Sequence, residues 1–244
     1  MRRRTLTEPA NNPDLISGIY NYCDRWCERC PLTSRCLVYA SEQEDDEPPE
    51  SRDLRNEAFW RRLGSIYLET RELIVEWASE AGLDLTANGE EDEARFHRKR
   101  QLIDNHPLAK SGKKYANTAS DWFREFDQTT EISDSERLED AREVIQWYQY
   151  QIAVKTIRAL SGRREEEDPE LADFPRDSDG SAKVALIGID RSIAAWRLMQ
   201  LSLPQRAGSI VPLILQLERL RQRLEKGFPQ ARDFVRPGFD EESV

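Results

Sequence analysis

The chain has 244 residues, of which 34% are charged and 38% hydrophobic, and its formal net charge is −10 at pH 7. That length can bury a sizeable core, and the acidic balance argues against non-specific nucleic-acid binding, because phosphates would repel it. No segment approaches the ~18 apolar residues of a membrane-spanning helix, so no membrane association is expected. Composition favours a cytoplasmic, mainly helical protein.

All four cysteines of the chain lie close together near its beginning, at Cys23, Cys27, Cys30 and Cys36. Four clustered thiols with no others to pair with indicate one site with four ligands. Structural zinc and iron–sulfur clusters are both held by four thiolates. Residues 1–40 are therefore predicted to form an N-terminal four-cysteine metal-binding module.

The spacing of the first three cysteines, by four and then three residues, predicts one face of an α-helix. Such a helix is expected to begin at Pro13, which suits a first helical position, and to end before Pro31. The last cysteine then returns on a second short helix through Ala40. Tyr22 and Trp26 are expected to shield the site from water.

The segment from Cys27 to Ala40 reads C-x2-C-P-L-x3-C-L-V-Y-A. It resembles the cysteine segments of [4Fe-4S] proteins in two families, the WhiB-like proteins and the endonuclease III-type DNA glycosylases. The resemblance is local, covers about 14 residues, and lacks the first-cysteine spacing and the other motifs of both families. It implies a [4Fe-4S] cluster and nothing about DNA.

Zinc and disulfides are the alternatives to the cluster. Zinc accepts the same four thiolates, and a zinc site would only stabilise the fold of the first 40 residues. Disulfides are disfavoured because thiols inside cells stay reduced.

The rest of the chain predicts an all-α helical bundle over residues 53–228, after an acidic linker at 41–52 and before a C-terminal tail at 229–244, whose residues 236–244 are expected to be loose. Apolar residues recur at helical spacing in most of the bundle's predicted segments. The predicted helices are 53–81, a polar helix from about 88, 114–127, 133–160, 182–203 and 209–227. The last of these carries a leucine-rich seam that could join two copies of the chain, formed by Ile210, Leu213, Leu217, Leu220 and Leu224.

A polar stripe marks one face of the 182–203 segment, where Lys183, Asp190 and Arg197 recur every seven residues. Together with Gln149 and Lys155 of the preceding segment, the stripe could line a polar pocket inside the bundle. Alternatively, the stripe faces water. Buried polar groups of this kind would have to satisfy one another.

Three functions remain open from the sequence, and catalytic residues are unknown. The first is a [4Fe-4S] protein that transfers electrons or senses redox state with a protein partner. The second is a zinc-containing helical interaction or scaffold protein. The third is an enzyme that binds a small molecule in the bundle pocket.

Overall fold

The computed structural model describes residues 12–43, 55–82, 85, 89–127, 136–166 and 177–240. These residues form helices and turns without any strand, which confirms the all-α prediction. The helices are α1 (Leu37–Gln43), α2 (Glu57–Glu80), α3 (Gly89–Asn105), α4 (Pro107–Asp127), α5 (Glu136–Glu166), α6 (Ser178–Ser202) and α7 (Ala207–Gly227). Within these ranges, no helix is long and apolar enough to cross a membrane.

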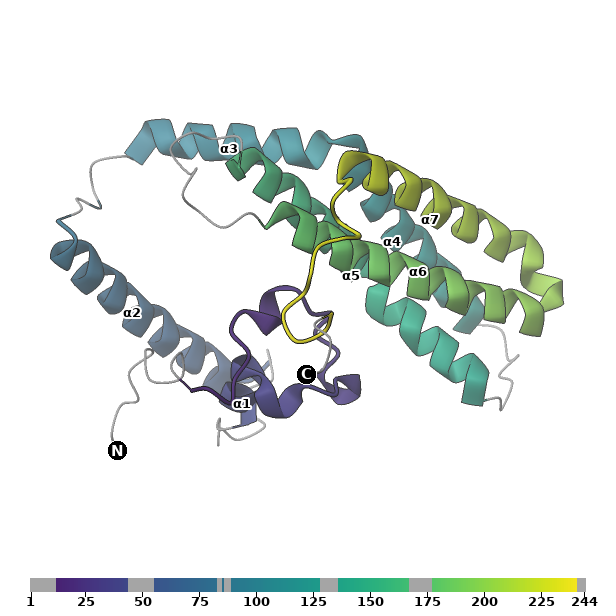
Figure 1. Ribbon diagram of the computed structural model, residues 1–244, viewed down its shortest axis with the longest axis horizontal. Coiled ribbons are helices and arrows are strands. Elements are labelled where there is room, and N and C mark those ends of the chain that lie inside the picture. The colour runs from purple at the N-terminus through teal and green to yellow at the C-terminus, as the bar shows by residue number, and fades with distance from the viewer. Residues whose placement is uncertain are drawn as a thin grey trace. The chain divides into compact units, whose positions relative to one another are not determined.

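Four of these helices, α4 to α7, form a bundle in which each helix contacts two neighbours (Figure 1). Helix α5 lies against α4 and α6, and α7 closes the ring by packing against α6 and α4. Tyr115, Tyr148 and Trp196 are fully buried between them. Burying side chains of this size stabilises the fold by roughly 1.5–3 kcal/mol each. The bundle prediction is therefore confirmed for the second half of the chain.

Helices α5 and α6 approach closely where Gly188 faces Tyr148. A Cβ atom at Gly188 would lie only 2.9 Å from Cδ1 of the tyrosine ring and 3.2 Å from Cγ1 of Ile152. A residue with a side chain at this position would force the helices apart. The glycine thus fixes how closely α6 approaches the face of α5 that carries Tyr148.

The leucine-rich seam of α7 faces the core of its own chain. Its five residues are each no more than 1% exposed. The expectation that this seam could join two copies is wrong, because α4 and α6 already cover it. Spacing alone cannot distinguish a seam between chains from a buried face within one chain.

The domain boundaries differ from the predicted ones. The chain divides into two compact units, the first comprising Met1–Leu37 with Gln101–Val244 and the second comprising Val38–Arg100. The cysteine-bearing residues belong to the same unit as the bundle, so residues 1–40 are not a separate module. The predicted acidic linker falls mostly outside the described residues, as does the predicted start of the helix at Ser133.

The second unit contains α2, which was expected inside the bundle. The helix begins where the Asn56 side chain accepts a hydrogen bond from the Ala58 amide, and Gly82 follows its end with a φ of 68°. The C-terminal end agrees with the prediction, whereas the helix begins at Glu57 and not at residue 53. Its apolar residues, however, are largely exposed, including Tyr67 and Trp77 at 68% each. Helical periodicity predicted the helix correctly but not its burial.

The C-terminal segment after α7 is packed up to Asp240, the last residue that the structure describes. Phe228 and Ala231 are buried, and residues 236–240 are half-buried. The prediction of a loose tail from residue 236 is wrong for residues 236–240. The segment runs alongside the N-terminal turns (Figure 1).

Candidate functional site

The four-cysteine segment is built from short turns instead of the predicted α-helix. Its regular pieces are three single 3₁₀ turns, η2 (Ile19–Asn21), η3 (Cys27–Arg29) and η4 (Thr33–Arg35). Gly18 and Arg25 interrupt any longer helix because both have positive φ angles, of 72° and 57°. Across Arg25, the Trp26 amide donates to Oδ1 of Asp24 at 3.2 Å, a local bond that competes with helical pairing.

All four cysteines are half-buried, and no disulfide joins them. The Cys30 amide donates to the carbonyl of Cys27 at 3.1 Å, and the Cys36 amide ends the next turn in the same way. Burial raises the pKa of the Cys23 thiol, which donates to the carbonyl of Tyr20 at 3.5 Å. Helix α1 follows directly after the last cysteine, as predicted.

The four sulfur atoms are not gathered around one point in this structure. Among the described residues, no three or more His, Cys, Asp or Glu side chains form a group that could hold a metal ion. A 3₁₀ turn has three residues per turn, so Cys27 and Cys30 lie on one side of the same turn. Cys23 and Cys36 belong to separate turns. One centre held by all four cysteines therefore requires these turns to move.

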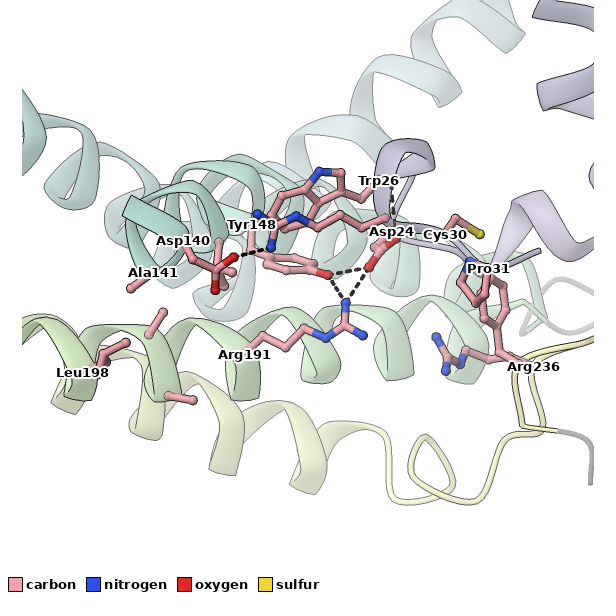
Figure 2. A pocket seen from close by; sticks show the side chains of 15 residues that line it. Asp24, Trp26, Cys30, Pro31, Asp140, Ala141, Tyr148, Arg191, Leu198 and Arg236 are labelled. Atoms are coloured by element: carbon pink, nitrogen blue, oxygen red, sulfur yellow. Dashed lines mark hydrogen bonds and ion pairs between the residues drawn. The ribbon is translucent and has the colours of Figure 1, made fainter. Parts of the chain in front are cut away.

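The segment is anchored to the bundle through Asp24 (Figure 2). Its carbonyl oxygen accepts hydrogen bonds from Nε1 of Trp147, at 2.9 Å, and from the side-chain amide of Gln151. Its carboxylate accepts from the Tyr148 hydroxyl and lies 2.7 Å from Nη1 of Arg191. The same guanidinium nitrogen also donates to the Tyr148 hydroxyl. One residue between two cysteines thus contacts both α5 and α6.

Aromatic packing holds the next part of the segment against α5. The Trp26 ring stacks on Trp147, with centroids 5.0 Å apart and 16° between the planes. The Arg29 guanidinium lies 4.1 Å from the centroid of Trp26 and forms ion pairs with Asp140, at 2.6 Å, and with Glu143. Trp26 was expected to shield the cysteines, but its described ring partners belong to the bundle.

The C-terminal segment meets the cysteine segment over Gly180 of α6. Tyr22 packs against Phe234 with centroids 4.8 Å apart. A Cβ atom at Gly180 would lie 2.3 Å from the ring of Tyr22 and 2.8 Å from that of Phe234. This close approach is possible only because the position carries no side chain.

An ion-pair cluster fixes the end of the C-terminal segment. Nζ of Lys183 lies 2.8 Å from Oδ2 of Asp240 and donates to the carbonyl of Phe234 at 2.6 Å. The Arg236 guanidinium binds both carboxylate oxygens of Asp240, at 3.0 and 2.9 Å. These hydrogen bonds, with Arg236 foremost, hold the pKa of Asp240 well below its usual range.

The other two members of the predicted polar stripe form separate ion pairs. Asp190 lies 2.7 Å from Arg232 and 3.2 Å from Arg221, and its side chain is 38% exposed. Arg197 lies 2.8 Å from Glu218 at the surface. The stripe therefore pairs outward with α7 and the C-terminal segment. It does not line a pocket inside the bundle.

The two predicted pocket residues of α5 also lie apart. Gln149 is 9% exposed, and its Oε1 has no hydrogen-bond partner among the described residues. Nζ of Lys155 instead donates to the carbonyl of Asn21 at 3.0 Å, and burial lowers the pKa of this ammonium. Lys155 is thus another attachment point for the cysteine segment.

A pocket with a volume of about 690 Å³ lies elsewhere on the bundle. It opens between α5, α6, the cysteine segment and the C-terminal segment, with Cys30 and Arg191 on its lining (Figure 2). Sequence reasoning missed Asp24, Tyr148 and Arg191 because no motif connects residues so far apart in the chain. No protein-family model, curated protein or solved structure matches this chain.

Proposed function

We propose that Cys23, Cys27, Cys30 and Cys36 hold one metal centre, a [4Fe-4S] cluster in preference to zinc. The centre would transfer electrons or sense redox state in contact with a protein partner. The observation that carries this proposal is that all the thiols of the chain are half-buried, without disulfides, in one segment docked on a rigid bundle. Four thiolates are the ligand set that both metals accept.

Metal binding would complete the fold of the segment. Ligands must lose their protons and approach one another, so binding and local folding are coupled. The segment is suited to such a change because its 3₁₀ turns contain few internal hydrogen bonds. The Asp24 contacts with α5 and α6 can persist while the neighbouring turns move. The cluster is preferred over zinc because of the local resemblance to iron–sulfur segments.

The experiment is anaerobic purification followed by elemental analysis and visible spectroscopy. A [4Fe-4S] cluster predicts about four iron atoms with sulfide per chain and a brown colour that bleaches on reduction. Stoichiometric zinc in a colourless protein would instead support the scaffold function.

Single Cys→Ser variants test the ligand set, and Ser34→Ala is the matched control because it changes an exposed side chain between two of the cysteines. Each cysteine variant should lose metal, whereas the control should retain it. If Cys36→Ser keeps its full metal content, the four-ligand proposal is wrong.

A further inference from the structure

The open pocket beside Cys30 has the dimensions of a small-molecule site. Its volume of about 690 Å³ falls inside the range of roughly 300–1,000 Å³ that ligand pockets occupy. Helices α5 and α6 supply its floor, and the two chain segments supply its sides. All four parts belong to the same compact unit.

The floor of the pocket is apolar and hollowed by small side chains. Ala141 and Val144 come from α5, and Ala194, Ala195 and Leu198 come from α6. Ala194 is exposed, so its methyl group leaves space that a larger residue would fill. Burying an apolar ligand body here would be favourable at about 25 cal/mol per Å² of surface removed from water.

The Arg191 guanidinium on the pocket lining has donor groups that are not used by the described residues of the protein. Arg191 uses Nη1 for both Asp24 and Tyr148, and its side chain is 55% exposed. Within the described part of the chain, its Nε and Nη2 donate to no acceptor. A planar guanidinium presents these two groups as a fork that matches a carboxylate. The Asp24 and Tyr148 contacts hold that fork in place (Figure 2).

The charges around the pocket select for a singly charged ligand. Arg29, Arg191 and Arg236 line it together with Asp24 and Asp140. Glu143 and Asp240 pair with two of these arginines, so four carboxylates surround three guanidiniums and would repel an incoming dianion more than a monoanion. A monocarboxylate meets less repulsion than a phosphate ester.

We propose that this pocket binds a small organic acid, with its carboxylate on the Arg191 fork and its apolar or aromatic body against the alanines of α5 and α6. The pocket shares Cys30 with the proposed metal centre, but the groups that would bind the acid are Arg191 and the apolar residues of α5 and α6. The pocket lining does not include the predicted stripe residues Lys183, Asp190 and Arg197.

The probes are 1-naphthoate, its neutral amide 1-naphthamide, and the dianion 1-naphthyl phosphate, measured by isothermal titration calorimetry on the purified full-length protein. The acid should bind at least about tenfold more tightly than either of the other two. Equal affinity for the amide would overturn the role of the guanidinium, and no binding of the acid would overturn the proposal.

Two variants locate the binding. Arg191→Lys keeps the charge but removes the fork, and should weaken 1-naphthoate binding about tenfold or more. Arg197→Lys is the matched control on α6, because Arg197 pairs with Glu218 outside the pocket, and it should bind as the unmodified protein does. Unchanged affinity in Arg191→Lys would contradict the proposal.

Ala194→Leu is a second test in case Arg191→Lys disturbs the fold. This substitution removes no polar contact, because Ala194 has no polar side chain. The leucine should fill the pocket and weaken binding, while circular dichroism remains unchanged. If Ala194→Leu binds 1-naphthoate normally, the acid binds elsewhere and the proposal is wrong. Metal analysis of the same preparations keeps the two proposals distinguishable, because acid binding is tested at Arg191 and Ala194 and metal binding at the cysteines.

Discussion

Helix α7 and the cysteine segment both pack against α6, but different forces hold them. Five apolar residues of α7, repeating every three or four positions, are buried at 0–1% exposure. The cysteine segment is fixed mainly by hydrogen bonds to one aspartate and to backbone carbonyls, with two aromatic contacts beside them.

The difference shows how each part of the fold is specified. Apolar burial is non-directional and depends on periodicity, so α7 tolerates many sequences that keep the pattern. Hydrogen bonds need particular partners at particular distances, so the cysteine segment depends on a few residues. Four substitutions test this contrast.

The largest effect is expected in α7, from Leu217→Ala. The side chain is fully buried, and its removal leaves a cavity, so the free energy of unfolding should fall by about 2–5 kcal/mol. Leu215→Ala, on the 43% exposed side of the same helix, should change it by less than about 0.5 kcal/mol. Urea denaturation measures both, and similar losses would contradict the assignment of the buried face.

A smaller but still substantial loss is expected from Asp24→Ala, which removes the carboxylate bound by Tyr148 and Arg191. Hydrogen bonds to charged groups contribute about 1.5–3 kcal/mol each. A double-mutant cycle with Arg191→Ala should show a coupling of at least about 0.5 kcal/mol.

Asp140→Ala is the control for the Asp24→Ala substitution. Its ion pair with Arg29 is exposed, and such pairs contribute about 0–1 kcal/mol. If Asp24→Ala costs no more than Asp140→Ala, the anchor role of Asp24 is refuted.

Gly180→Ala should cost about 1–3 kcal/mol by overpacking, because its Cβ would overlap the rings of Tyr22 and Phe234. Gly208→Ala is a fitting comparison, since a Cβ atom there would meet no heavy atom of the described residues within 4 Å apart from its chain neighbours and its own helix backbone, and it should be neutral or stabilise by up to about 1 kcal/mol. Limited proteolysis should also show faster cleavage near residue 22 in Gly180→Ala. Equal protection in both variants would argue against this contact.

The smallest effect concerns pH. The pKa of Asp240 is lowered in the folded protein, mainly by hydrogen bonds from Arg236. Its contribution to stability is therefore complete above the unfolded pKa of about 3.9, and it is lost as the pH falls below that value. Asp240→Asn should flatten the decrease in unfolding free energy on acidification. Parallel pH profiles for the two proteins would show that Asp240 contributes nothing.

The sequence predicted the helices well because periodicity records local structure. The α7 stripe could be placed from residue spacing, and the C-terminal end of α2 from Gly82. Periodicity could not tell that the α7 stripe is buried whereas the apolar residues of α2 are exposed. Nor could it predict the turns around the cysteines, because their conformation depends on bonds from Asp24 to residues of α5 and α6 more than 120 positions away. No local pattern contains that information.

Asp24 and Arg191 are 167 positions apart in sequence, so the ribosome makes Asp24 well before its partner. At roughly 5–20 residues per second, a ribosome needs about 8–33 s to make the intervening chain. For most of that interval all four cysteines have been synthesised, while α6, which begins at Ser178, has not. Any factor that delivers iron, sulfide or zinc to the nascent chain would meet these thiols before they dock.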